Sequence, residues 1–277
     1  MNEIVRYEIG SVTLTRVPYF DVALDPAVVG LTAADIDAIE WARPTWVDAD
    51  GQPLVGQVGW VIESDGRVLL VDPCGASDPF LRTGPEAITH QDAFVAAMRA
   101  AGFAPERVDS VVLSHLDGIG MAAAAQPDGT WGPLFPNARV VLTAHELAWL
   151  EQQTDVGGLD ALRALIAQGL VDGVADDHHF TDAVRFERTG GHTPGHAVVH
   201  VESGGAHAVL LGHLALSPLN LRGLPYKGGQ VDVAEANAWL VPFIARSWKT
   251  DDTLLIGPLW PAPGAARITR PGFVVPA

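Results

Sequence analysis

Histidine and aspartate side chains lie at the ends of several apolar segments of this 277-residue chain. His115 and Asp117, two residues apart in the stretch SHLDGIG, follow the apolar run SVVL. His192 and His196 lie in GGHTPGH, and His213 follows AVLLG. Imidazole and carboxylate groups bind metal ions and transfer protons near neutral pH. These segments are therefore candidates for a metal site or an acid–base site, although SHLDGIG could also be only a turn.

The segment GGHTPGH carries the most specific signal of the chain. Its Pro and Gly exclude a helix and predict a tight loop that presents both imidazoles. A single histidine is more often structural than functional, and a hydrogen-bonded loop pair remains the alternative here. Several histidines at successive strand ends can instead converge on one rim, which favours a shared site.

The elements that must position these residues are short strands alternating with helices. Runs of about five to eight residues with many β-branched side chains, bounded by Gly, Asp or Pro, predict strands. They cover residues 10–20, 57–64, 66–74, 108–115, 138–145, 183–189, 196–203, 207–216, 252–258 and 272–277. Helical spacing predicts helices at 31–43, 91–103, 159–170 and 233–248. This order predicts an α/β fold with two strand-rich halves, for which a four-layer αββα sandwich would fit.

Composition sets the class of protein. With 48% hydrophobic residues, the chain can bury a large core, and a single domain over residues 1–277 is expected. The one cysteine, Cys74, excludes an internal disulfide. A formal charge of −16 would repel nucleic acid and anionic lipid, so neither is expected as a partner. The N-terminus lacks a signal-peptide pattern and no apolar run is long enough for a membrane span, so a cytoplasmic location is expected.

Several segments, in this order and spacing, resemble the metallo-β-lactamase fold superfamily, in particular its lactonase-like and phosphotriesterase-like hydrolases. They are GRVLLVDPCG, AGFAPERVDSVVLSH, DGTWGPLFPNARVVLTAHELAWL, GGHTPGHAVVHVES, VLLGHLALSP and LLIGPLWPAPGAARI. The resemblance implies an αββα sandwich whose two sheets hold a metal centre at one edge. It also implies hydrolase activity.

The chain departs from the metal motif of that family. The family's HxHxDH motif supplies two histidines to one metal and an Asp and a His to the other, and SHLDGIG stands in its place. In one alignment His115 takes the first His position, Asp117 keeps the Asp position and Gly118 replaces the last His. In the other, His115 is the second His and Leu113 replaces the first. Two of the three motif histidines are missing in both alignments.

The remaining ligand positions are carried over one at a time. His196 matches the third histidine of the first metal, His213 replaces the bridging aspartate, and Leu259 replaces the last histidine. The second metal keeps only Asp117, so a dinuclear centre is not expected. His115, His196 and His213 could still hold one zinc ion with an open water position, with Asp117 as fourth ligand or base. Asp117 and His213 are the catalytic candidates.

Such a centre would lower the pKa of a bound water to about 7 and suit hydrolysis of a small apolar ester or lactone. One alternative is a metal-independent lyase or isomerase that uses the His/Asp cluster as acid and base. Another is a non-catalytic binder of small molecules. Four tryptophans could line an apolar site for it, unless they only pack in the core: Trp41, Trp46, Trp60 and Trp260.

The remaining histidines are interpreted as structural or solvated. His178 and His179 lie in a polar loop. His90, His145, His200 and His207 have no acidic or histidine partner at ligand spacing in the sequence. The oligomeric state does not follow from these patterns.

Overall fold

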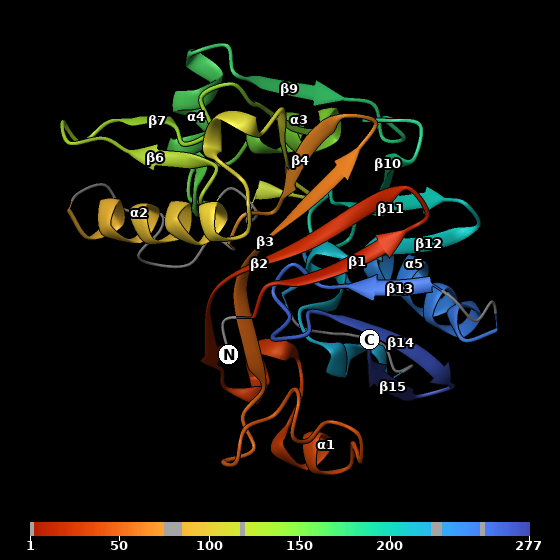
Figure 1. The fold of residues 1–277 in the computed structure, drawn as a ribbon. Helices are drawn as coiled ribbons and strands as arrows, with labels where there is room; N and C mark the ends of the chain where they lie inside the picture. Colours follow the sequence, from red (N-terminus) through yellow and green to blue (C-terminus); the bar gives the residue numbers. More distant parts are fainter. Residues whose placement is uncertain (1–2, 75–84, 117–119, 223–228, 250–252) are drawn as a thin grey trace.

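The computed structural model describes residues 3–74, 85–116, 120–222, 229–249 and 253–277 (Figure 1). In the described chain, two sheets of seven and six strands carry most of the structure. The first sheet has the order β1-β2-β3-β4-β5-β8-β9, and β4, β5, β8 and β9 run parallel. Its strands are β1 (Val5–Ile9), β2 (Val12–Ala23), β3 (Leu54–Ser64), β4 (Arg67–Val71), β5 (Ser110–Val112), β8 (Arg139–Thr143) and β9 (Val171–Val174).

The second sheet has the order β10-β11-β12-β13-β14-β15, with β12 and β13 parallel and the other pairs antiparallel. Its strands are β10 (Val184–Arg188), β11 (Ala197–Ser203), β12 (Ala206–Leu210), β13 (Thr253–Ile256), β14 (Ala265–Arg270) and β15 (Phe273–Pro276). A separate small hairpin joins β6 (Ala123–Ala125) to β7 (Trp131–Pro133). The described helices are α1 (Ala33–Asp37), α2 (Pro85–Ala100), α3 (Ala144–Leu150), α4 (Leu159–Ala167) and α5 (Val233–Ser247).

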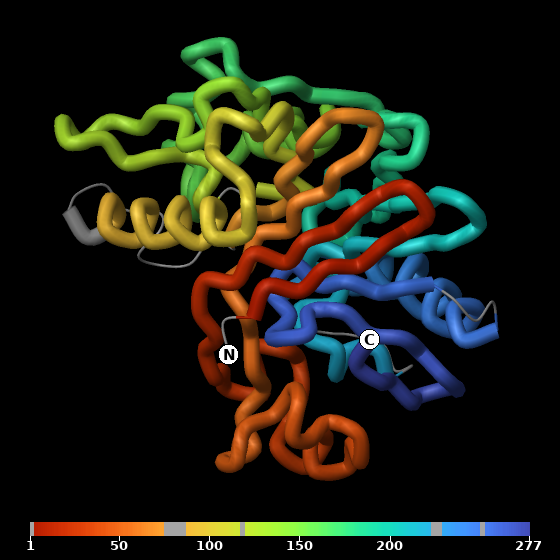
Figure 2. Tube along the Cα trace, in the orientation of Figure 1, coloured from red at the N-terminus to blue at the C-terminus, as the bar shows by residue number. Residues whose placement is uncertain are grey.

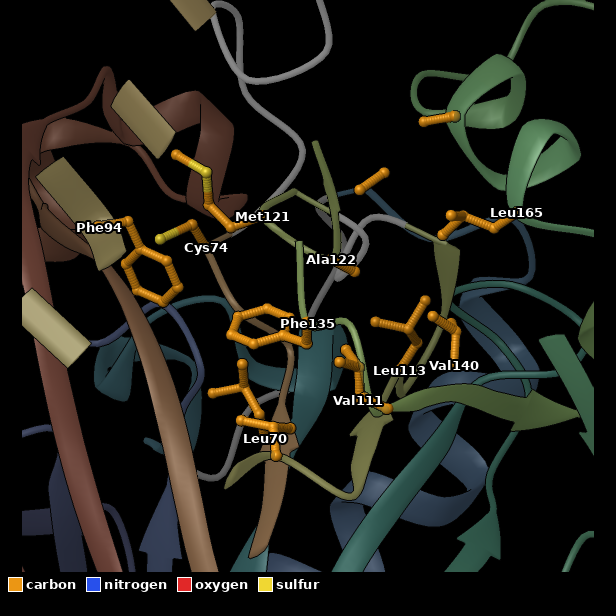
Figure 3. Close-up of a cluster of buried hydrophobic side chains, with 14 of the residues drawn as sticks. Leu70, Cys74, Phe94, Val111, Leu113, Met121, Ala122, Phe135, Val140 and Leu165 are labelled. Atoms are coloured by element: carbon orange, nitrogen blue, oxygen red, sulfur yellow. The ribbon is translucent and has the colours of Figure 1, made fainter. Parts of the chain in front are cut away.

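Three apolar clusters show how these elements stack. The first lies between helices α2 and α4 and the outer face of the first sheet, where Phe94 and Leu165 pack against Val111 and Val140 (Figure 3). The second lies between the two sheets and includes Leu14, Val58, Val112, Phe186, Val199 and Leu254. The third lies between the second sheet and α5 and includes Val198, Val209, Leu240, Phe243 and Leu255. The expected αββα layering is therefore confirmed.

The side chains of each strand alternate between the two faces of its sheet, and this alternation produces the layers. In β11, Val198 belongs to the cluster under α5 and Val199 to the cluster between the sheets, because successive side chains of a strand point to opposite faces. Two hairpins connect neighbouring strands within these sheets. Asp65 and Gly66 join β3 to β4 with φ of 51° and 75°, and Gly204 and Gly205 join β11 to β12 with φ of 59° and 84°. Positive φ at both central residues matches the right-handed twist of the flanking strands.

The structure differs from the expected elements at several places. Strands β1, β6, β7, β9 and β14 are additional, and α3 occupies residues that include the predicted strand end at 144–145. The helix expected at 31–43 is confined to Ala33–Asp37, although Thr32 caps it as expected, accepting a hydrogen bond from Asp35 N–H. Within the described part of the chain, no helix combines the length and apolarity that crossing a membrane requires.

Candidate functional site

Three loops meet at the edge where β4, β5, β8 and β12 end. Ser114–His115 follows β5, residues 189–196 connect β10 to β11, and His213 lies in a 3₁₀ turn, Gly212–Ala215, directly after β12. The two sheets are joined here, because Ala197 N–H at the start of β11 donates a 2.9 Å hydrogen bond to the Ser114 carbonyl. The backbone thus brings residues from both sheets to one place.

His115, His192 and His213 form a cluster of imidazoles, which we call the edge cluster. The potential ligand atoms of the three residues all lie within 4.8 Å of one another. His115 Nε2 lies 3.0 Å from His213 Nδ1. The His192 ring is perpendicular to that of His115, with 4.5 Å between centroids, and its centroid lies 5.0 Å from that of His213. His115 and His213 are buried, whereas His192 is partly exposed.

His196 lies beside the edge cluster, but both of its nitrogens have other partners. Its Nε2 accepts a 3.2 Å hydrogen bond from the backbone N–H of His213, and its Nδ1 lies 2.8 Å from Thr189 Oγ1. Burial lowers the pKa of His196 well below its usual value, and the neighbouring His115, His192 and His213 lower it further. The ring is therefore neutral near pH 7, and it supports the turn that carries His213.

The loop after β4 holds Ser114 and His115 in place. Asp72 Oδ1 accepts a 2.8 Å hydrogen bond from Ser114 N–H, and Ser114 Oγ lies 2.8 Å from His115 Nδ1. Asp72 and Cys74 have φ of 41° and 57°, a conformation that costs non-glycine residues energy and is found often at functional sites. Gly120 must remain a glycine here, since a Cβ would lie 1.7 Å from the Cys74 carbonyl oxygen.

A buried carboxylate, Glu146, connects two of the site loops. Its Oε1 accepts a hydrogen bond from Leu116 N–H at 3.1 Å. Its Oε2 accepts from Thr193 Oγ1 at 2.7 Å and from Gly195 N–H at 3.1 Å. Burial raises the pKa of Glu146, and these hydrogen bonds together with the nearby His192 oppose that rise. Glu146 thus fixes the HTPGH loop relative to the loop that carries His115.

The structure brings together His115 and His213 of the expected set and adds His192, which the sequence places in the GGHTPGH loop but does not assign as a ligand. Asp117 and Gly118 lie outside the described residues. Leu113 packs with Val111 and Val140 in the first apolar cluster (Figure 3). Leu259 is also buried. Neither leucine position therefore contributes polar chemistry to the site.

Three of the four tryptophans agree with the core-packing interpretation. Trp46, Trp60 and Trp260 are fully buried. Trp41 is partly buried and donates to the Gly272 carbonyl. The interpretation of several histidines as lacking a partner needs correction, because His200 contacts Glu187 and His207, and His145 contacts Asp176. The His200 contacts join neighbouring strands, and the His145 contact joins α3 to the segment after β9, so spacing along the sequence does not reveal them.

Solved structures with a similar fold include the dizinc quorum-quenching lactonase AidC in complex with the product N-hexanoyl-L-homoserine. It is 18% identical with a TM-score of 0.77, and the alignment covers 99% of this chain and 97% of that one. The hydrolase AbOPH of the beta-lactamase superfamily is 18% identical with a TM-score of 0.75, over 100% and 98% of the two chains. The chain has the metallo-β-lactamase fold.

Similar solved structures share the fold with this chain but have low sequence identity to it. A probable metal-dependent hydrolase from Staphylococcus aureus is 13% identical, with a TM-score of 0.70 over 94% of each chain. No family model matches the chain, and no curated protein matches it in sequence. The shared property is the fold, and the site must be judged on its own residues.

The donor set of the edge cluster could hold a metal ion. Three imidazoles with an open fourth position are a known arrangement for a catalytic zinc. Among the described residues, no further imidazole, thiol or carboxylate joins the edge cluster at ligand distance. A second ion in this metallo-β-lactamase fold would need such groups.

Proposed function

We propose that this protein is a hydrolase of a small lactone or ester, with one zinc ion held by His115, His192 and His213. The observation that carries the proposal is the edge cluster itself, whose ligand atoms lie within 4.8 Å of one another at the shared edge of the two sheets. Similar structures of the fold include lactonases, which supports this substrate class.

The contact between His115 and His213 brings two possible ligand atoms together. Their nitrogens face each other at 3.0 Å, where one can donate a hydrogen bond to the other or, after a small shift, both can bind a cation. If His115 Nδ1–H donates to Ser114 Oγ, the lone pair of His115 Nε2 faces this space. A zinc ion bound there would polarise a carbonyl oxygen and lower the pKa of a water molecule to about 7.

Residues around the edge cluster position its imidazoles, and a further residue is the proposed proton acceptor. We assign His192 to the ligand set in place of His196, because His196 Nε2 already accepts a hydrogen bond from His213 N–H. Glu146 holds the loop of His192 against the loop of His115. We keep Asp117 as the proposed proton acceptor, since it follows His115 by two residues in the chain.

The test combines metal content with hydrolysis of N-hexanoyl homoserine lactone and a short-chain aryl ester. Protein purified without chelator is expected to hydrolyse at least one of them and to lose activity when zinc is removed. His192→Ala and His213→Ala should each lower metal affinity or activity by at least about 10- to 100-fold. That is the loss expected when even a group that supports a metal ligand is mutated. His145→Ala, which changes an exposed imidazole paired with Asp176, serves as the matched control.

The outcomes separate the candidate functions. Hydrolysis that is unaffected by zinc removal but lost in His213→Ala would reject the metal centre and favour acid–base chemistry by the His115–His213 pair. Absence of any turnover by zinc-loaded protein, with tight binding of the lactone, would reject the hydrolase and favour a binder.

A further inference from the structure

A row of polar side chains crosses the α5-facing side of the second sheet, away from the edge cluster. Cross-strand register aligns Arg185 with His200, Glu202 with His207, and His207 with Thr253. Residues two apart in a strand share a face, so four strands contribute to one row. Its members are Arg185, Glu187, His200, Glu202, His207 and Thr253.

Three members of this row have the separations of metal ligands. His200 Nδ1 lies 3.0 Å from His207 Nε2, and Glu202 Oε1 lies 3.5 Å from His207 Nε2 and 3.9 Å from His200 Nδ1. A tetrahedral zinc ion with bonds of 2.0–2.1 Å spaces its ligand atoms roughly 3.3 Å apart. Shifts of a few tenths of an ångström would therefore complete the geometry.

Neighbouring groups orient both imidazoles for this role. His200 Nε2 lies 2.7 Å from Glu187 Oε2, and Trp239 Nε1–H of α5 donates to Glu187 Oε1 at 2.6 Å. The carboxylate accepts a hydrogen bond from His200 Nε2–H, which leaves the Nδ1 lone pair of His200 facing His207. On His207, Nδ1 lies 3.3 Å from Thr253 Oγ1. A carboxylate behind one ligating histidine and a hydroxyl behind the other is typical of protein metal sites.

The surroundings leave room for a further ligand. The side chain of His200 is 6% exposed, that of His207 30% and that of Glu202 53%. A hollow of about 320 Å³ borders both histidines and is also lined by Phe243, Arg246 and Thr253. Water can therefore reach the open side of the three ligand atoms.

We propose that His200, Glu202 and His207 bind a divalent zinc-class ion, at a site distinct from the edge cluster and independent of the proposed hydrolase activity. His200 follows His196, which lies beside the edge cluster, by four positions, roughly 13 Å along the extended chain. The ion clamps the β11–β12 hairpin, and binding to the folded state alone raises the melting temperature. It competes with Arg185, whose Nη2 lies 3.3 Å from Glu202 Oε1.

Cobalt binding to the full-length protein tests the site, because Co²⁺ replaces Zn²⁺ and its visible spectrum reports imidazole coordination. The wild type is expected to bind one more equivalent than His207→Ala and than Glu202→Gln, whose exposed side chain makes misfolding a poor explanation. Arg185→Gln should bind cobalt more tightly at this site, and His145→Ala should match the wild type.

The hydrolase assay separates this site from the edge cluster. His207→Ala is expected to keep wild-type hydrolysis while losing one cobalt equivalent and the metal-dependent rise in melting temperature. Equal cobalt stoichiometry in the wild type, His207→Ala and Glu202→Gln would overturn the proposal. So would a cobalt spectrum that is lost only in His213→Ala.

Discussion

At the scale of single residues, the partner of one ring nitrogen decides what a histidine can do. His192 and His196 lie four residues apart in one loop, yet His192 faces His115 and His213 while His196 Nε2 accepts the N–H of His213. A ring nitrogen whose lone pair accepts a hydrogen bond, as His196 Nε2 does, cannot bind a metal ion at the same time. The difference arises from the turn at Gly212, which brings the His213 backbone onto the His196 ring.

Substitution of Glu146 tests the role of its buried carboxylate. Glu146→Gln replaces one acceptor oxygen of the buried carboxylate by an NH₂ group that faces N–H or O–H donors. Because an unsatisfied buried donor costs about 1–3 kcal/mol, we expect the free energy of unfolding to fall by that amount. Chemical denaturation monitored by circular dichroism measures it.

Glu151→Gln is the matched control, since it makes the same change on an exposed residue of the same region. Its free energy of unfolding should stay within about 0.5 kcal/mol of the wild type. Equal stability of Glu146→Gln and Glu151→Gln would show that the buried carboxylate does not hold the two loops together.

At the scale of elements, the sequence predicted where the site lies better than which groups form it. Apolar periodicity located β5, β11 and β12, and therefore the strand ends that carry His115 and His213. It missed α3, whose start was assigned to a strand although Thr143 caps it by accepting from Glu146 N–H. A Thr followed three residues later by Glu is a helix-start signal. The contacts of Glu146 with Leu116 and Gly195 join segments far apart in the chain, and no local pattern reveals them.

Gly195 gives a prediction about how elements pack. A Cβ at this position would lie 2.1 Å from the backbone nitrogen of Glu146, where the HTPGH loop contacts the start of α3. Backbone atoms cannot move aside as a flexible side chain can, so Gly195→Ala must displace the loop or α3. We expect a loss of unfolding free energy beyond the roughly 1–3 kcal/mol typical of overpacking, together with loss of metal binding at the edge cluster.

Gly129→Ala separates steric clash from backbone strain. Gly129 has φ of 83° with open space around the Cβ position, so its replacement costs only the strain of about 1 kcal/mol. Thermal unfolding of both variants compares the two costs. A Gly195→Ala protein as stable as Gly129→Ala would refute the tight packing of the loop on α3.

At the scale of the whole molecule, the two sheets are joined at both ends of the layer between them. Ala197 donates to Ser114 beside the edge cluster, and at the other end Ser11 N–H donates to Ser203 Oγ at 3.1 Å. The Tyr7 side chain of β1 also contacts the C-terminal residue, because its hydroxyl donates to the Ala277 backbone oxygen at 2.8 Å; Figure 2 traces both segments. Such contacts between distant segments fix the relation of the sheets, and no pattern within a single strand encodes them.

The Tyr7 hydroxyl makes the stability of the folded protein depend on pH. Burial raises the pKa of Tyr7 to about 12, although the nearby Arg16 charge acts in the opposite direction. In the unfolded chain this tyrosine ionises near its ordinary pKa of 10.0, whereas in the folded protein its pKa is about 12. The contribution of Tyr7 to stability is therefore complete below pH 10 and is lost as the pH rises through about 12.

Tyr7→Phe should lower the free energy of unfolding near pH 8 by about 0.5–1.5 kcal/mol, because the hydroxyl hydrogen bonds to Ala277 and Pro263 are removed. It should also reduce the decline of stability between pH 10 and about 12, since the ionisable group is gone. Denaturant unfolding at several alkaline pH values measures both effects, and the tyrosinate absorbance of the folded protein should lose its transition near pH 12. If the pH–stability curves of the wild type and Tyr7→Phe run parallel, the Tyr7 hydroxyl is not buried against the C-terminal residue Ala277.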